Sequence, residues 1–177
     1  MPDKVVNVVV AGLGGQGVLK ASDILADAAF RAGYDVKKSE VHGMSQRGGS
    51  LSSDVRFGDI VRSPLIPTGE AHFLLVLEPT QVEPNRYQLR EGGILITPDH
   101  LDVNALENRR SLNVAMLGAL SVYLAIPQPE WDDAIRAALP DKHHVVNLKA
   151  FAIGRAAETA FRQANPSAPV SLVPKRV

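Results

Sequence analysis

Apolar residues are distributed along the chain in two patterns, continuous runs and stripes with helical spacing. Continuous runs predict buried strands at residues 5–10, 73–77 and 94–97. Residues 50–57 alternate apolar and polar side chains, which is typical of a half-exposed strand, and residues 34–39 fit a short strand. Helical spacing predicts helices at residues 18–32, 114–124, 130–139 and 146–163. The order of these elements indicates an α/β fold with a Rossmann-like beginning.

Single residues predict several element boundaries. Gly33 is expected to end the first helix, and Asn113 to cap the helix at 114–124. A further helix is expected to start at Pro79 and to end at Gly92-Gly93. The helix at 114–124 is apolar all round, which favours a place in the core over a contact with a partner.

The stretch Gly12-Leu13-Gly14-Gly15-Gln16-Gly17 joins the first predicted strand to the first predicted helix. Glycine permits positive φ and a close approach of a ligand to the backbone, while free N–H groups at a helix start attract anions. The spacing fits G-x-G-x-x-G, so Gly14, Gly15, Gln16 and Gly17 are candidate cofactor-binding residues. A glycine-rich turn that only permits tight packing explains the same spacing, and this alternative stays open.

A second polar loop, Glu40–Gly49, reads E-V-H-G-M-S-Q-R-G-G and fits neither a helix nor a strand. Its candidate binding residues are His42, Ser45, Gln46, Arg47 and Gly48. An arginine such as Arg47 can bind a phosphate or carboxylate through two hydrogen bonds, or form an ion pair with a neighbouring subunit. We expect the two glycine loops to converge at the carboxyl ends of adjacent strands.

The sequence offers little support for a metal site, a serine nucleophile or an acid–base pair. The five histidines, at positions 42, 72, 100, 143 and 144, lack the spacing of metal ligands. We expect His72 to be structural, and His143 and His144 to be solvated. No serine lies in a G-x-S-x-G elbow, and no acid–base pair accompanies the glycine loops. The chain therefore resembles a binding domain, or one part of an active site shared with another chain.

Composition narrows the classes of function. The 177 residues suit one domain, residues 1–165, followed by an extended tail, residues 166–177. The 19 basic and 19 acidic residues cancel, so we expect neither a nucleic-acid nor a membrane-surface partner. The chain contains no cysteine, which excludes disulfides and thiolate ligation of zinc or iron–sulfur clusters by this chain. No apolar run approaches the length of a membrane span, so we expect a cytoplasmic location.

The two glycine loops together are specific to a family. Gly12–Val18 and Glu40–Gly49, followed by Ser53–Gly58, Leu75–Pro79 and Asn113–Leu120, resemble the gamma-type subunit or domain of 2-oxoacid:ferredoxin oxidoreductases. The H-G-M-x-Q-R-G-G form is most similar to the beta subunit of indolepyruvate ferredoxin oxidoreductase and its aryl-2-oxoacid relatives of the phenylglyoxylate dehydrogenase type. The resemblance extends over residues 5–158.

This resemblance implies a three-layer α/β/α domain with a mostly parallel sheet. It implies an enzyme that uses thiamine diphosphate with Mg and coenzyme A to decarboxylate a 2-oxoacid oxidatively to its acyl-CoA. Electrons would leave through iron–sulfur clusters to ferredoxin or to NAD. The larger partner subunits would hold the thiamine diphosphate and the clusters, and this chain would contribute part of the coenzyme A path. No residue here is assigned a catalytic role.

Two alternatives to the oxidoreductase subunit stay open on the sequence. A stand-alone NAD- or FAD-binding Rossmann protein would use the glycine fingerprint and Glu40 as its ribose acid, but it leaves the second loop unexplained. A non-catalytic assembly module is the other alternative. The identity of the 2-oxoacid also stays open, because indolepyruvate, phenylpyruvate and phenylglyoxylate all fit the resemblance.

Overall fold

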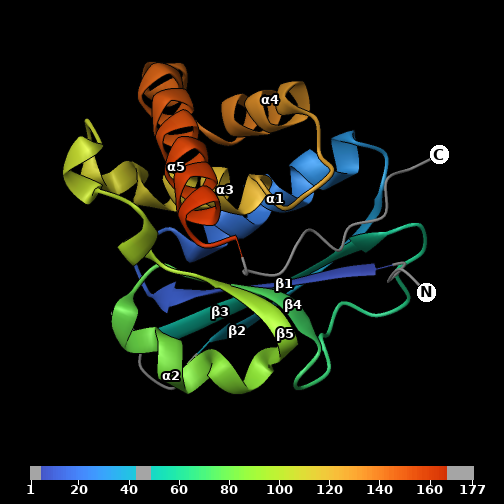
Figure 1. Cartoon of the computed structure of the whole chain (residues 1–177). Helices are drawn as coiled ribbons and strands as arrows, with labels where there is room; N and C mark the ends of the chain where they lie inside the picture. The colour runs from blue at the N-terminus through green and yellow to red at the C-terminus, as the bar shows by residue number, and fades with distance from the viewer. Residues whose placement is uncertain (1–4, 43–48, 167–177) are drawn as a thin grey trace.

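The computed structural model describes residues 5–42 and 49–166, which form a mixed sheet covered by helices (Figure 1). The strands are β1 (Val5–Leu13), β2 (Asp35–His42), β3 (Ser50–Gly58), β4 (Ala71–Val76) and β5 (Leu89–Ile96). Their order in the sheet is β2-β3-β1-β4-β5. β1 pairs in parallel with β4, and β4 with β5, while β3 pairs antiparallel with both β1 and β2. Four strands therefore point the same way and only β3 runs against them.

The helices form two unequal layers on the sheet (Figure 1). One face carries α1 (Val18–Arg31), α3 (Leu112–Ser121), α4 (Gln128–Ala138) and α5 (His144–Ala164). The opposite face carries the short α2 (Val82–Asn85), flanked by the 3-10 turns η1 (Pro79–Gln81) and η2 (Arg86–Gln88). The remaining 3-10 turns are η3 (Pro98–His100), η4 (Val103–Ala105), η5 (Arg109–Ser111) and η6 (Asp141–His143). The expected α/β fold is confirmed, with one thin helical layer.

Most predicted elements are confirmed, and the differences have local causes. The helix expected from Pro79 is only the short η1–α2–η2 segment. Gly92 and Gly93 lie inside β5, where Gly92 has a φ of +70° that suits glycine, instead of ending a helix. Leu112, not Val114, begins α3. The predicted strand at 34–39 is β2, but β3 lies between it and β1, so the first three elements do not form a neighbouring β-α-β unit.

The main hydrophobic core lies between the sheet and the four long helices. α3 runs through its centre: nine of its ten residues are buried. The apolar helix expected at 114–124 is therefore part of the core and offers no contact surface. Among the described residues, no helix is both long and apolar enough to cross a bilayer.

His144 corrects one expectation about the histidines. Its side chain is mostly buried, and Nε2 lies 2.7 Å from the carbonyl oxygen of Leu139 and 2.9 Å from that of Arg136. These carbonyls belong to the last turn of α4, where no helical partner is available. His144 thus closes the α4–α5 connection, whereas we expected it to be solvated. His72 is structural as expected, since its Nδ1 accepts the Asn7 N–H at 2.9 Å.

Asn7, the one polar residue in the first apolar run, holds the long 59–70 connection to the sheet. Its side chain donates to the carbonyl oxygen of Glu70 at 3.0 Å and accepts a hydrogen bond from Arg56 Nε at 2.9 Å. Arg56 Nη1 in turn donates to the carbonyl oxygens of Ser63 and Leu65. The connection therefore depends on side-chain bonds from β1 and β3.

Replacing Arg56 with leucine should release this connection. The variant loses three hydrogen bonds from a charged donor, so we expect the free energy of unfolding to fall by about 2 kcal/mol. Chemical denaturation measures the change. Lys37→Leu is the control, because Lys37 makes only a long 3.9 Å ion pair with Asp35 and should lose about 0.5 kcal/mol or less. Equal losses in both variants would contradict this assignment.

Candidate functional site

The glycine loop joins β1 to α1 through residues 14–17. Gly15 and Gly17 have φ values of +88° and +80°, a left-handed conformation that side chains rarely adopt. Gly17 is the N-cap of α1, and no side chain caps the helix there. A Cβ added at Gly15 would have no atom within 4 Å, so the backbone at this point faces open space. The loop therefore presents exposed backbone beside an uncapped helix N-terminus.

Gln16 holds this loop in place. Its Oε1 accepts a hydrogen bond from the Leu13 N–H at 2.7 Å, and its Nε2 donates to Glu78 Oε2 at 2.9 Å. Glu78 follows β4, so the contact joins the loops after two parallel strands. Gln16 was a candidate binding residue, but its amide already makes two bonds within the protein.

Asn113 belongs to the same loop contact, although we expected it to cap a helix. It is the second residue of α3 and 7% exposed, and its Nδ2 donates to the carbonyl oxygen of Gly17 at 3.2 Å. A Cβ at Gly17 would overlap the Asn113 amide. Gly17 is therefore required both by its φ and by the packing of Asn113.

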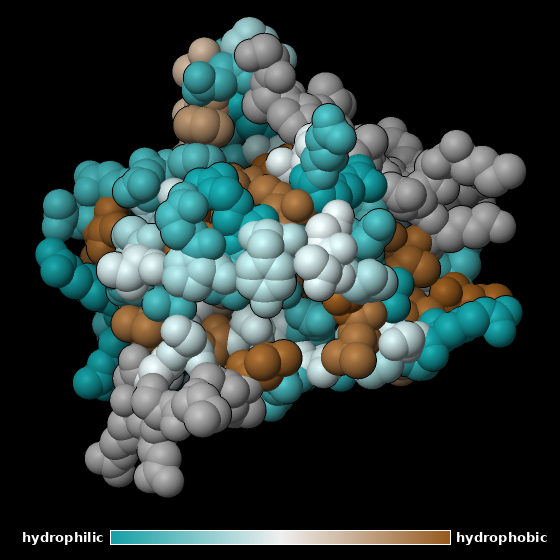
Figure 2. Space-filling model, turned by 90° about the horizontal axis from the view of Figure 1, so that it is seen from below, coloured by the Kyte–Doolittle hydropathy of each residue, from teal (hydrophilic) through white to brown (hydrophobic). Residues whose placement is uncertain are grey.

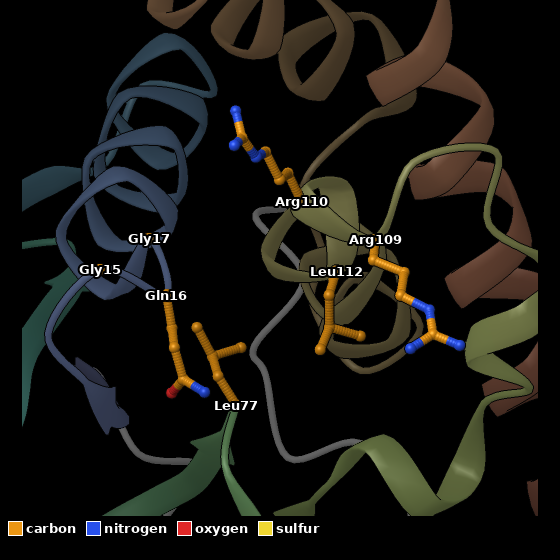
Figure 3. A pocket seen from close by; sticks show the side chains of 7 residues that line it. All are labelled: Gly15, Gln16, Gly17, Leu77, Arg109, Arg110 and Leu112. Atoms are coloured by element: carbon orange, nitrogen blue, oxygen red, sulfur yellow. The ribbon is translucent and has the colours of Figure 1, made fainter. Parts of the chain in front are cut away.

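A cavity of about 590 Å3 opens beside this loop, lined by Gly15, Gln16, Gly17, Leu77, Arg109, Arg110 and Leu112. Figure 3 shows the glycines on one side and η5 with Leu112 on the other. Arg109 turns away from the glycine side, and its Nη2 donates to Asn104 Oδ1 at 3.1 Å. Arg110 extends from η5 toward α1, and its guanidinium has no partner among the described residues. The cavity thus combines uncapped N–H groups with an available cation.

The second loop meets the first at its base. β2 ends at His42, β3 begins at Ser50, and the Gly14 N–H donates to the carbonyl oxygen of Gly49 at 2.9 Å. Gly49, the last residue of the second loop, thus contacts the first loop, but the two strands that precede the loops are not adjacent as expected, because β3 separates them. Four candidates, Ser45, Gln46, Arg47 and Gly48, lie outside the described residues.

Glu40 does not suit the role of a ribose-binding acid. It lies within the edge strand β2, two positions from β1 in the sheet. Its Oε1 accepts from Lys38 Nζ at 2.8 Å, and Lys38 also pairs with Asp23 of α1. In a dinucleotide fold the acid ends a parallel strand next to β1. This geometry removes the main support for the stand-alone Rossmann alternative.

Sequence reasoning missed two features at the carboxyl edge of the sheet. The first is Arg110, which lies in a polar, loop-like stretch at residues 99–110. The second is Glu158, which is fully buried and bonded to His100 Nδ1 at 2.7 Å and to the Tyr123 hydroxyl. Burial is the main cause that raises the pKa of the Tyr123 hydroxyl, and the hydrogen bond to Glu158 raises it further. Helical spacing alone carries no signal for this cluster, because its members come from η3, α5 and the end of α3.

Comparisons with known proteins agree with the geometry. A family model described as pyruvate ferredoxin/flavodoxin oxidoreductase matches residues 7–105. The chain is 35% identical to indolepyruvate oxidoreductase subunit IorB of Thermococcus kodakarensis over 190 residues, covering 84% of this chain and 93% of that protein. These matches include both glycine loops and the sheet that holds them.

Two solved structures share the fold. The gamma subunit of a keto/oxoacid ferredoxin oxidoreductase from Geobacter sulfurreducens superposes with a TM-score of 0.76 at 24% identity, over 88% of this chain and 99% of that one. A 2-oxoglutarate:ferredoxin oxidoreductase from Magnetococcus marinus, with 2-oxoglutarate, coenzyme A and succinyl-CoA bound, gives 0.81 at 19% identity over 98% of this chain and 34% of that one. The resemblance found in the two glycine loops is confirmed: the chain belongs to the pyruvate ferredoxin/flavodoxin oxidoreductase family.

Proposed function

We propose that this chain is the small subunit of a thiamine-diphosphate-dependent oxidoreductase that converts an aryl 2-oxoacid, such as indolepyruvate, to its acyl-CoA. One 2-oxoacid and one coenzyme A give one acyl-CoA and one carbon dioxide. Starting from the 2-oxoacid anion, the reaction also releases one proton and two electrons, and iron–sulfur clusters of the larger subunit would carry the electrons to ferredoxin or NAD. The 35% identity to an indolepyruvate oxidoreductase subunit over nearly its whole length supports this assignment.

The observation that carries the proposal for this chain's own role is the cavity between the glycine loop and Arg110. Coenzyme A is anionic through its diphosphate and its 3′-phosphate. The exposed backbone at Gly15, the uncapped start of α1 and the guanidinium of Arg110 all favour a bound anion. This cavity therefore holds a phosphate-bearing part of coenzyme A, and Arg110 contributes the charge.

The other cofactors belong to the partner subunits. An iron–sulfur cluster needs thiolate ligands, and the sequence has no cysteine. Residues 5–42 and 49–166 contain no group of three or more metal-ligating side chains in reach of one ion. We therefore propose that the larger subunit holds the clusters, and we assign the thiamine diphosphate with its Mg to it on the family resemblance.

Arg110→Ala in the assembled enzyme tests the role of the cavity. We expect the KM for coenzyme A to rise about tenfold, the effect of losing one charge-assisted phosphate bond, while the KM for the 2-oxoacid stays the same. Steady-state reduction of a viologen acceptor measures both constants. Arg109→Ala is the matched control, since its guanidinium bonds to Asn104 and should leave the KM for coenzyme A unchanged.

Two results would overturn the proposal at different levels. An unchanged KM for coenzyme A in Arg110→Ala removes this cavity from the coenzyme A path but leaves the subunit assignment intact. A wild-type chain that forms no complex with a larger subunit, and binds NAD or FAD tightly in a titration, removes the assignment itself.

A further inference from the structure

The face of the sheet opposite the long helices is only partly covered. α2 and its flanking turns cover one part of this face, and the connection at 59–70 is tied to β1 and β3 (Figure 1). Figure 2 views the molecule from this side, where apolar patches lie among polar atoms. Four large apolar side chains are strongly exposed in β2, the 59–70 connection and η2: Val41 at 53%, Ile60 at 65%, Leu65 at 58% and Tyr87 at 63%.

A groove of about 170 Å3, the lower groove, lies between the β2–β3 hairpin and the α2 segment. Val41, Ser50 and Ser52 line it on the hairpin side, and Gln81, Asn85 and Tyr87 line the opposite side. None of the described residues that line it is charged, whereas the cavity beside the glycine loop has two arginines. The lower groove therefore suits an uncharged occupant.

Gln81 supplies an independent sign that something binds there. The residue is 8% exposed, and its side-chain Oε1 is buried with no hydrogen-bond partner among residues 5–42 and 49–166. The amides that flank it are engaged elsewhere: Asn85 Nδ2 donates to the Gln81 carbonyl oxygen, and Gln88 Nε2 to Asn85 Oδ1. A buried acceptor without a donor is costly and rare in native structures. An occupant that donates an N–H would satisfy it.

A solved structure with the same fold indicates which molecule occupies the lower groove. In the Magnetococcus marinus structure the same fold makes up 34% of a longer chain, so there the fold is covalently joined to further residues of that chain. Contacts that are made within one chain in such an enzyme become contacts between subunits when the domain is separate. The lower groove also lies at the base of the second glycine loop, since Val41 and Ser50 flank it on the two strands.

We propose that the lower groove is the docking site for the larger subunit of the oxidoreductase. The docked segment is uncharged, packs apolar side chains against Val41 and Tyr87, and donates a backbone or side-chain N–H to Gln81 Oε1. Docking there places the partner at Ser50, next to Gly49, whose carbonyl oxygen accepts the Gly14 N–H. This inference rests on the function proposed above, and its test separates the two.

The test measures binding of the full-length chain to the purified larger subunit by titration. We expect Tyr87→Glu to weaken binding at least tenfold, because it places a charge in an uncharged contact. Tyr87 is exposed, so the variant should keep the melting temperature of the free chain. Val145→Glu on α5 is the matched control: Val145 is 64% exposed, lies outside the lower groove, and should leave binding unchanged.

Gln81→Met gives a second test, in which the stability of the free chain and its binding to the larger subunit are expected to change differently. Methionine keeps the volume of the side chain and removes the unsatisfied acceptor, so the free chain should be as stable as the wild type or more stable. Binding to the larger subunit should nevertheless weaken severalfold. A purely structural glutamine would not separate stability from binding in this way.

Each remaining outcome overturns a defined statement. Wild-type binding by both Tyr87→Glu and Gln81→Met moves the interface elsewhere and leaves the proposed function intact. A free chain that light scattering shows to be a dimer, and that Tyr87→Glu makes monomeric, assigns the lower groove to a second copy. No binding by the wild-type chain overturns the proposed function, and this inference with it.

Discussion

Gly154→Ala is expected to lower the free energy of unfolding by about 3 kcal/mol or more, the largest effect of any substitution considered for this chain. Gly154 lies on α5 where that helix crosses α3, and a Cβ there would overlap the carbonyl oxygen of Ala115. Gly118 on α3 meets the backbone of Phe151 on α5 in the same way. Both obstacles are backbone atoms, which cannot move without separating the two helices.

The sign of the change in stability distinguishes close helix packing from helix propensity. Helix propensity alone predicts that alanine in place of glycine stabilises a helix by about 1 kcal/mol. The overlap with Ala115 predicts the opposite. Because α3 is buried along nearly its whole length, separating it from α5 would open the main core.

Chemical denaturation of the free chain measures the change. Ala156→Leu is the control on the same helix, since Ala156 is exposed and added bulk there should cost about 0.5 kcal/mol or less. A Gly154→Ala variant that is more stable than the wild type would show that α3 and α5 pack less closely than described.

Gly17→Ala is expected to damage both stability and coenzyme A binding. The left-handed conformation at Gly17 costs a residue with a side chain about 1–2 kcal/mol, and the new methyl group displaces the Asn113 amide. The loop then loses its bond from Asn113 as well. We expect the free energy of unfolding to fall by about 2–3 kcal/mol in total. In the assembled enzyme the KM for coenzyme A should rise at least tenfold, because the start of α1 is displaced from the cavity.

Gly15→Ala separates the two causes. Gly15 has a similar φ but open space around its Cβ position, so this variant should carry the same backbone cost of about 1–2 kcal/mol and no clash. Adding Asn113→Ala to Gly17→Ala should recover part of the loss, and a double-mutant cycle gives the coupling between the two residues. Equal losses in Gly15→Ala and Gly17→Ala, with no coupling to Asn113, would contradict the packing described here.

The contacts of the glycine loop show where sequence reasoning reached its limit. The spacing of Gly14, Gly15 and Gly17 indicated a strand-to-helix turn, and two of these glycines have positive φ. No local pattern indicated that Asn113, 96 residues away, would hold this turn. Its position before an apolar helix favoured a cap, because capping is a local pattern and a contact between distant helices is not.

Local patterns determined most of the fold and of the family. The positions that a strand or helix buries must be apolar, so burial leaves a pattern of apolar residues in the sequence. The spacing of these residues was sufficient to place β1, β4 and the four long helices. The two glycine loops identified the family because their spacing reflects backbone conformations that only glycine adopts easily.

Only the tertiary structure decided the rest. Strand order depends on which hydrogen bonds form between distant segments, so periodicity could not predict that β3 separates β1 from β2. Glu158 and Gln81 gain their significance from burial, and Arg110 from the cavity that the fold forms beside it. The sequence by itself therefore determined the elements, the glycine turns and the family. Packing between distant elements decided which polar side chains are engaged within the protein and which have no partner among the described residues.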